Sequence, residues 1–291
     1  MDDNGCKGGG KKESPMKVLG KEEVEEIKKQ LLLGENLQEV RHKLLVLSGK
    51  GGVGKSTVAA SIAVALSLKG KKIGLMDIDV HGPSIPKILG LEGAPLMAAE
   101  EGLFPIRYSN GLDVISIGFF LPDQDNPVIW RAPLKHSMIR QFLTEVKWGE
   151  LDYLVIDCPP GTGDEPLSVV HLLEKEQVDG AVVVTTPQDV ALTDVRKSIT
   201  FCRTVNLPII GVVENMSGFV CPHCGETVDI FKRGGGEKMA REMGVPFLGN
   251  IPLDPLMVEA GDSGKPFMQH FPDSATARAF DRILEPILAL E

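Results

Sequence analysis

The residues with the clearest chemical potential form a glycine-rich stretch that ends in a lysine and two hydroxyl residues. Positions 49–57 read GKGGVGKST, which satisfies the G-x-x-x-x-G-K-[ST] pattern of a phosphate-binding loop. Glycines let the backbone curl until its N–H groups point at phosphate oxygens, and the positive end of a following helix strengthens the site. The stretch therefore predicts a P-loop nucleoside triphosphatase that binds ATP with Mg²⁺.

Each residue of this loop has an expected role. Lys55 is expected to reach the β- and γ-phosphates, Ser56 to ligate Mg²⁺ through its hydroxyl, and Thr57 to contact the α-phosphate. The backbone that wraps the phosphates is expected to come from Gly49, Lys50, Gly51, Gly52, Val53 and Gly54.

Three aspartates stand at the ends of apolar runs, where they can serve the same loop. Asp77 and Asp79 follow KKIGLM, and Asp157 ends LDYLVID. Parallel sheets bind ligands beyond the carboxyl ends of their strands, so these carboxylates are expected beside the phosphates. Asp157 is interpreted as a Walker B carboxylate that holds Mg²⁺ through water, although aspartate is also a common turn residue. The segment CPPGTGDE after it is expected to sense the γ-phosphate and to move when that group is lost.

A second chemical feature is the pair Cys221 and Cys224 in the sequence CPHCG. A chain that turns at such a pair aims two thiolates at one point, as metal knuckles do. Two thiolates do not complete a tetrahedral site, and the 5 cysteines include no second CxxC. Two facing copies of the chain would supply four thiolates, which suit either an iron–sulfur cluster or Zn²⁺.

Other interpretations of the cysteines stay open. The pair is also compatible with a redox-active CxxC, although it does not open a helix, or with a structural pair that binds nothing. His223 can ligate a metal, but a position pointing to solvent is the simpler expectation. Cys6 is expected to be a free thiol in a glycine-rich leader, with metal binding as the alternative, whereas Cys158 and Cys202 lie in apolar stretches and are expected to be buried.

These sites need a scaffold, and the apolar pattern predicts one. Continuous apolar runs predict strands at 43–48, 72–77, 112–117, 153–157, 181–185, 208–213 and 247–251. Helical patterns lie between and after them, at 56–68, 134–146, 165–173, 190–204, 236–243 and 274–288. Strands that are apolar throughout and alternate with helices predict an α/β fold, with a mostly parallel central sheet covered by helices on both faces.

The chain is predicted to hold one large domain behind a short N-terminal extension. Residues 1–20 are rich in glycine and lysine and are expected to be disordered, and 21–40 are expected to contain a helix. Val24, Ile27 and Leu31 share helical spacing in that helix, which favours docking on the body, with a solvated helix as the alternative. The ATPase domain is assigned to 41–291, with the metal knuckle at 219–230.

The last predicted helix carries Phe280, Ile283, Leu284 and Ile287 on one side. Its flanks are mixed in charge rather than basic, so docking on the core is favoured over lying on a membrane surface.

Composition narrows the class of protein further. Of the 291 residues 43% are hydrophobic and 24% charged, which is ordinary for a globular protein. The net charge of -9 argues against a non-specific nucleic-acid binder. No signal peptide and no bilayer-spanning apolar run is visible, so we expect a cytoplasmic protein without a nucleic-acid or membrane partner.

Together the motifs resemble a known family. Lys50 inside the loop is typical of deviant Walker A ATPases, which include MinD, ParA, the nitrogenase iron protein and the arsenite-pump ATPase. Within that group, MDIDVHGPSIP, WRAPLKHS, DYLVIDCPPGTGDE, TTPQDVALTDVRK, VVENMSGFVCPHCGE and LGNIPLDP resemble the Mrp/ApbC iron–sulfur cluster carrier ATPases. The resemblance runs from about residue 43 to about residue 267 in the family's order.

The resemblance implies a homodimer that hydrolyses ATP slowly. In it Lys50 would reach the partner's nucleotide, Asp79 would orient the attacking water, and Lys55 would complete the catalytic set. Asn215 would contact adenine, with Asp254 as a second candidate.

The resemblance also implies a cargo. Cys221 and Cys224 would bind a [4Fe–4S] cluster shared between the subunits, which the dimer would transfer to apo iron–sulfur proteins. The sequence departs from the family at Ala132, where glycine is usual, and at positions 232–233, where Lys-Arg precedes three glycines. Neither departure touches the predicted chemistry.

Three alternative functions remain. A spatial-organising ATPase like MinD or ParA would call for a membrane helix or a basic surface, which the acidic charge and the CPHC disfavour. A zinc-stabilised dimeric ATPase would use the same four sulfurs. An electron-donating reductase like the nitrogenase iron protein is disfavoured because its two cysteines lie far apart in sequence.

Overall fold

The computed structural model describes residues 21–80, 82–99, 102–109, 111–120, 132–174, 176–221 and 223–290. The predicted leader at 1–20, with Cys6, lies outside the described residues. So do the first two residues of the WRAPLKHS motif and the side chains of Val24, Ile27 and Ala132.

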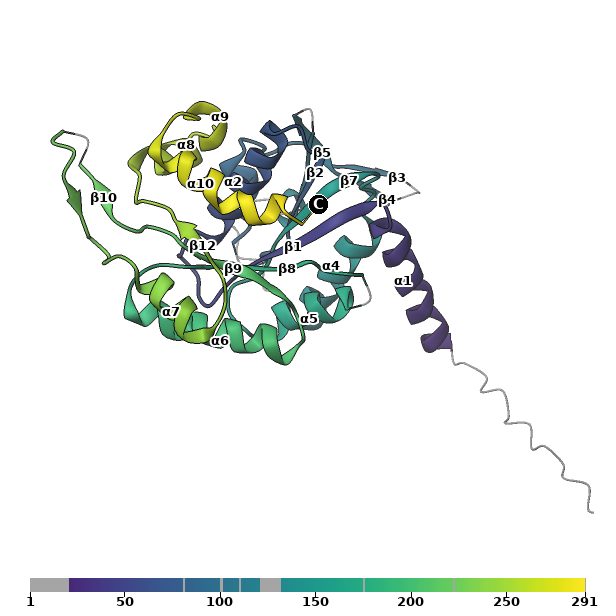
Figure 1. Cartoon of the computed structure of the whole chain (residues 1–291). Helices are drawn as coiled ribbons and strands as arrows, with labels where there is room; N and C mark the ends of the chain where they lie inside the picture. Colours follow the sequence, from purple (N-terminus) through teal and green to yellow (C-terminus); the bar gives the residue numbers. More distant parts are fainter. Residues whose placement is uncertain are drawn as a thin grey trace, which may run out of the picture.

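The centre of the fold is an eight-stranded sheet in the order β12-β9-β8-β1-β7-β2-β6-β5 (Figure 1). Its strands are β1 (Val40–Ser48), β2 (Ile73–Asp77), β5 (Ile106–Ser109), β6 (Leu112–Ser116), β7 (Leu151–Asp157), β8 (Gly180–Thr185), β9 (Ile209–Glu214) and β12 (Phe247–Asn250). Neighbouring strands are parallel throughout, except that the edge strand β5 runs antiparallel to β6. The predicted α/β fold with a mostly parallel sheet is therefore confirmed.

Helices cover both faces of the sheet, as predicted. One face packs against α1 (Lys21–Leu37), α4 (Ala132–Glu145), α5 (Asp164–Leu173), α6 (Asp189–Thr204) and α7 (Gly235–Met243). The other face packs against α2 (Lys55–Leu68), α3 (Ile85–Ile88), α8 (Pro255–Asp262), α9 (Phe267–His270) and α10 (Ala275–Leu288). Figure 1 shows the two layers on opposite sides of the strands. Each layer buries its own aliphatic cluster, which explains how the core forms with few aromatic residues.

Several short elements are absent from the sequence-based prediction. They are β5, α3, α8, α9, the 3-10 turn Ile117–Phe120 and the hairpin of β3 (Met97–Ala99) with β4 (Gly102–Phe104). Most have four residues or fewer, which is too short for a hydrophobic period to show. The exception is α8, whose start carries a readable signal: Asp254 caps the helix and Pro255 occupies its first turn. A further hairpin, β10 (Phe219–Val220) with β11 (Thr227–Val228), lies where the sequence predicts the knuckle at 219–230.

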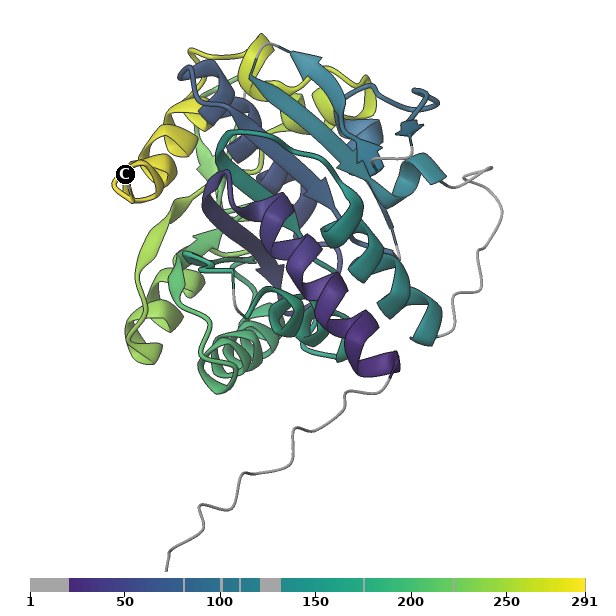
Figure 2. The same ribbon diagram turned by 90° about the vertical axis from the view of Figure 1, so that its right-hand side faces the viewer.

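The N-terminal helix docks on the body, but not through the predicted side chain. Leu31 is 63% exposed, whereas Leu33 and Leu37 are each 1% exposed within the core cluster. The helix ends at Leu37, within the stretch 21–40 where it was predicted, and lies alongside α4 (Figure 2). Because β1 already begins at Val40, the predicted boundary between residues 40 and 41 falls within the first strand.

The closing helix α10 packs on the core, as expected. Phe280, Ile283, Leu284 and Ile287 are all fully buried in the cluster shared with α2 and the sheet. Among the described residues, no helix combines the length and the apolar character needed to cross a bilayer.

Replacing Phe280 by alanine tests the packing of α10. Phe280 is 0% exposed, so Phe280→Ala should lower the free energy of unfolding by about 3–5 kcal/mol through lost burial and a residual cavity. Denaturant unfolding measures this change. Arg282→Ala, an exposed position on the same helix, is the matched control and should stay within about 0.5 kcal/mol of the parent. Equal stability of the two variants would contradict the packing.

Candidate functional site

The phosphate-binding loop joins β1 to α2, as its sequence predicts. Gly52 and Gly54 have φ angles of 78° and 82°, in the left-handed region that favours glycine. A Cβ on Gly54 would lie 2.2 Å from Nδ2 of Asn215, and one on Gly49 would lie 2.4 Å from a backbone carbon of Asp194 in α6. Neighbouring segments therefore require these glycines in addition to any demand from a phosphate.

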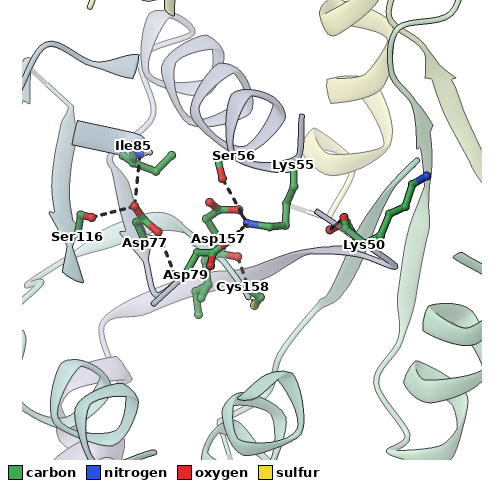
Figure 3. A network of polar contacts seen from close by, with 11 residues as sticks. Lys50, Lys55, Ser56, Asp77, Asp79, Ile85, Ser116, Asp157 and Cys158 are labelled. Carbon is green, nitrogen blue, oxygen red and sulfur yellow. Dashed lines mark hydrogen bonds and ion pairs between the residues drawn. The ribbon is translucent and has the colours of Figure 1, made fainter. Parts of the chain in front are cut away.

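Lys55 lies at the centre of the polar network beside the loop (Figure 3). Its Nζ is 2.6 Å from Oδ1 of Asp157 and 3.3 Å from Oδ2 of Asp79. Burial opposes the charge on the ammonium group, but the two carboxylates overcome it and raise the pKa of Lys55. The loop therefore carries a fixed positive charge, and Lys55 is oriented by one carboxylate from the end of β7 and one from the turn after β2.

Asp77 and Asp157 face each other across two neighbouring strands. They are register partners between β2 and β7, and both are fully buried. Burial, with a contribution from the carboxylate of Asp157, raises the pKa of Asp77 to about 8. Asp77 accepts hydrogen bonds from Oγ of Ser116 at 2.8 Å and from the backbone N–H of Asp79 at 3.1 Å. Asp77 thus fixes the turn after β2, and Asp79 presents its carboxylate to Lys55.

Asp157 retains an acceptor that the described side chains do not use. Its Oδ2 is buried and has no hydrogen-bond partner among the described residues, while its Oδ1 accepts from Lys55. Burial raises the pKa of Asp157, although Lys55 opposes the shift. An unsatisfied buried oxygen is costly, and a hydrated divalent cation or a water can satisfy it. The oxygen donors Asp157 and Ser56 therefore fit Mg²⁺.

The segment after Asp157 is attached to the strand that leads into the loop. The backbone N–H of Cys158 donates to the carbonyl of Val46 at 3.2 Å, and that of Gly161 to the carbonyl of Ser48 at 2.8 Å. Residues 162–164 beyond this attachment are exposed. The part of CPPGTGDE nearest the strands is thus fixed, whereas the part that follows is open to a ligand or a partner.

The other predicted nucleotide residues occupy different environments. Lys50 is half-buried and points away from the network around Lys55 (Figure 3). Asn215 is buried, and its Nδ2 donates to the carbonyl of Val53 at 2.9 Å, so it contacts the loop directly. Asp254 caps α8 through the N–H of Leu256 and accepts from the hydroxyl of Thr276, which gives it a structural function.

The cysteine pair sits at the tip of the β10–β11 hairpin, which projects from the body beyond the β12 edge (Figure 1). The N–H of Cys221 donates to the carbonyl of Glu226, and the N–H of Gly225 to the carbonyl of Cys221, each at 2.9 Å. Cys221 is half-buried, and Cys224 and His223 are exposed. Hydrogen bonds from the backbone of Cys224, then from that of His223, lower the pKa of Cys221. The turn therefore favours a thiolate before any metal is present.

The remaining described cysteines are buried, as expected. Burial raises the pKa of Cys158 above the ordinary range of a thiol, and that of Cys202 to about 11. Both thiols are therefore protonated and protected at neutral pH.

One prominent polar residue was missed by the sequence-based reasoning. Glu214 ends β9 immediately before Asn215, is fully buried, and accepts three hydrogen bonds from the segments that flank the hairpin. A charged residue closing the apolar run PIIGVV was the available signal, because a buried carboxylate needs specific partners.

Comparison with known proteins agrees with this geometry. Residues 39–288 match the family model described as ParA: NUBPL iron-transfer P-loop NTPase. An iron–sulfur cluster carrier protein of Methanocaldococcus jannaschii is 53% identical over 254 residues, covering 87% of this chain and 86% of that protein. The cytosolic Fe–S cluster assembly factor NUBP2 of Bos taurus is 50% identical over 256 residues, covering 87% and 94%.

Solved structures show the same fold. A nucleotide-binding protein of Archaeoglobus fulgidus in complex with ADP superposes with a TM-score of 0.70 at 39% identity, covering 85% of this chain and 98% of that one. The cell-division ATPase MinD of Pyrococcus furiosus superposes with a TM-score of 0.64 at 25% identity, covering 86% and 99%.

Thiol alkylation tests the contrast between the hairpin and the core. Cys221 should react with iodoacetamide at neutral pH faster than a reference cysteine peptide, because its lowered pKa increases the thiolate fraction. Its rate should fall only as the pH drops through that lowered pKa. Cys158 and Cys202 should stay unlabelled until the protein is denatured. Peptide mass spectrometry resolves each site, and labelling of native Cys202 at the rate of Cys221 would contradict the structure.

Proposed function

This chain belongs to the ParA/NUBPL family of iron-transfer P-loop NTPases, and from that premise we propose how its two sites work together. The chain is an iron–sulfur cluster carrier that binds ATP with Mg²⁺, hydrolyses it slowly and delivers a [4Fe–4S] cluster to apo-proteins. The single observation that carries the proposal is the pair of half-buried Cys221 and exposed Cys224 on a projecting hairpin of a P-loop fold. The names of the relatives from Methanocaldococcus jannaschii and Bos taurus support the same cargo.

The nucleotide site supplies positioning and electrostatics. Lys55 would contact the β- and γ-phosphates and neutralise charge that develops during transfer. Asp79, beside Lys55 and only 6% exposed, is suited to orient the attacking water. Ser56 and Asp157 would hold Mg²⁺, which would neutralise negative charge on the phosphates. ADP in the Archaeoglobus fulgidus relative supports nucleotide binding by this loop.

Two features support a homodimer. Lys50 belongs to the loop but points away from the cluster around Lys55, which suits contact with a nucleotide held by a second chain. Cys221 and Cys224 supply half of a four-thiolate site, which a two-fold axis would complete. Asn215, already bonded to the loop, would read the adenine at the same face.

The hairpin suits a cargo that must leave. Cys224 is exposed and Cys221 half-buried, so a bound cluster would remain accessible to a recipient protein. The lowered pKa of Cys221 favours the thiolate that iron requires. Zn²⁺ can occupy four thiolates as well, and family membership is what favours iron and sulfide. The cytosolic assembly factors among the relatives support a cytoplasmic localisation.

Anaerobic reconstitution tests the cargo. Incubation with ferric iron, sulfide and excess dithiothreitol, whose thiols supply the electrons that bring the iron to the mixed-valence state, should give a broad visible absorption band and about four irons per pair of chains. Cys221→Ala and Cys224→Ala should each abolish iron uptake, because each removes two of the four ligands from the dimer. Cys202→Ala, a buried thiol away from the hairpin, is the control and should take up iron normally. Stoichiometric zinc without iron uptake would overturn the cluster assignment.

Lys55→Ala tests the nucleotide site independently. The variant should lose ATP binding and turnover, measured by calorimetry and phosphate release, yet still take up iron at the hairpin. It leaves buried carboxylates without their ammonium partner, so its free energy of unfolding should fall by up to about 3–5 kcal/mol. Lys69→Ala, an exposed lysine just beyond the end of the same helix, should behave like the parent. ATP turnover that survives Lys55→Ala would refute the loop assignment.

A further inference from the structure

Glu214 lies between the two sites and belongs to neither. Its carboxylate is 0% exposed at the end of β9. It accepts from Oγ of Ser217 at 2.5 Å, from the N–H of Gly234 at 2.9 Å and from the N–H of Gly236 at 2.5 Å. Ser217 stands just before the cysteine hairpin, and the two glycines stand just after it. One side chain therefore holds both ends of the segment that carries Cys221 and Cys224.

The next residue holds the phosphate loop. Asn215 donates from Nδ2 to the carbonyl of Val53 at 2.9 Å, and its backbone N–H donates to Thr185 in β8 at 2.7 Å. Consecutive residues at the end of one strand are thus bonded to the two sites separately.

The chain between these residues and the hairpin is tightly constrained. Met216 has a φ angle of 55°, an uncommon left-handed conformation for a residue other than glycine, and Gly218 follows with 75°. The N–H of Ser217 donates to Ile251, and the N–H of Leu253 donates back to Gly218. A displacement of Asn215 would therefore be transmitted along the backbone to the hairpin, because the intervening residues have little conformational freedom.

The return side of the hairpin is equally fixed. A Cβ on Gly236 would lie 3.0 Å from the Glu214 carboxylate, and one on Gly235 would lie 2.5 Å from the carbonyl of Pro187. Lys232 has a φ angle of 71°, and its Nζ lies 2.5 Å from Asp189 at the start of α6. The three-glycine run is thus the cradle of the Glu214 carboxylate, which explains its composition without reference to phosphate.

We propose that Glu214 is a positioning residue that couples the phosphate loop to the cysteine hairpin. Nucleotide binding at the loop shifts Asn215, and Glu214, joined to it by one peptide bond, moves both ends of the hairpin together. The role of this coupling in cluster transfer rests on the function proposed above. The coupling itself depends only on nucleotide binding and on the three hydrogen bonds.

Glu214→Gln separates the coupling from the fold. An ionised carboxylate only accepts, whereas the glutamine amide places an NH₂ donor against one of the three donors. The side chain keeps its size, so the packing around it is retained. The set of three hydrogen bonds that links it to both ends of the hairpin is disrupted. Glu226→Gln makes the same chemical change at an exposed position on the hairpin and is the matched control.

Hydrogen–deuterium exchange gives the decisive readout. Amide exchange over residues 217–236 is measured with and without a non-hydrolysable ATP analogue and Mg²⁺, at protein concentrations where sedimentation shows the same oligomeric state. In the parent and in Glu226→Gln the analogue should change the exchange rate by about fivefold or more, the lower end of typical coupling between sites. Glu214→Gln should bind the analogue with unchanged affinity and lose that response. A simple packing defect would instead raise exchange equally in both nucleotide states.

The outcomes separate this inference from the proposed function. A parent hairpin that ignores the nucleotide, or a Glu214→Gln variant that responds like the parent, would overturn the coupling even if iron uptake is normal. A Glu214-dependent response in a protein that takes up no iron would support the coupling and refute the cargo. If Glu214→Gln fails to fold, Ser217→Ala removes one of the three donors, and its response should fall below that of the parent; a full response there would also overturn the coupling.

Discussion

The arrangement of the whole nucleotide site depends on one buried ammonium group. Lys55 lies among carboxylates from the ends of β2, β7 and the turn after β2, and none of these charges is accessible enough for water to screen it well. Without the lysine, the carboxylates of Asp79 and Asp157 would repel each other at the edge of a dry sheet. With it, the parallel strands can end in acidic residues beside the phosphate-binding loop, because the ammonium group offsets their charge.

Features that depend on residues close together in the sequence could be predicted, whereas features that depend on residues far apart in the sequence could not. The phosphate loop and Asp157 were predictable because a short motif between a strand and a helix fixes their geometry. The sheet was predictable because its strands are apolar throughout. The contact of α1 was not, because Leu31 and Leu33 are equally apolar, and only the position of α4 decides that Leu33 is buried and Leu31 exposed. Glu214 was missed for a similar reason, since its partners Gly234 and Gly236 lie about twenty residues further along the chain.

Residues with the same predicted role can also occupy different environments, and a sequence motif does not show this difference. The predicted adenine candidates Asn215 and Asp254 both follow strands, yet one contacts the phosphate loop and the other caps a helix. Asp77 and Asp79 are two positions apart, and one serves the turn while the other faces Lys55. Spacing identifies which side chains can reach a site, and hydrogen bonding decides which of them remain available to a ligand.

The exposed hairpin affects how molecules of this protein associate in solution. Val220, Val228 and Ile230 are each about half exposed, because a two-stranded ribbon has no second layer to cover them. Such a surface attracts any other apolar surface at short range, while the net charge of -9 repels other copies at longer range. Salt shortens the repulsion to the Debye length but leaves the apolar attraction intact. Ionic strength therefore controls how readily two chains approach each other. At low salt, the net negative charge limits non-specific association through the apolar side chains of the hairpin.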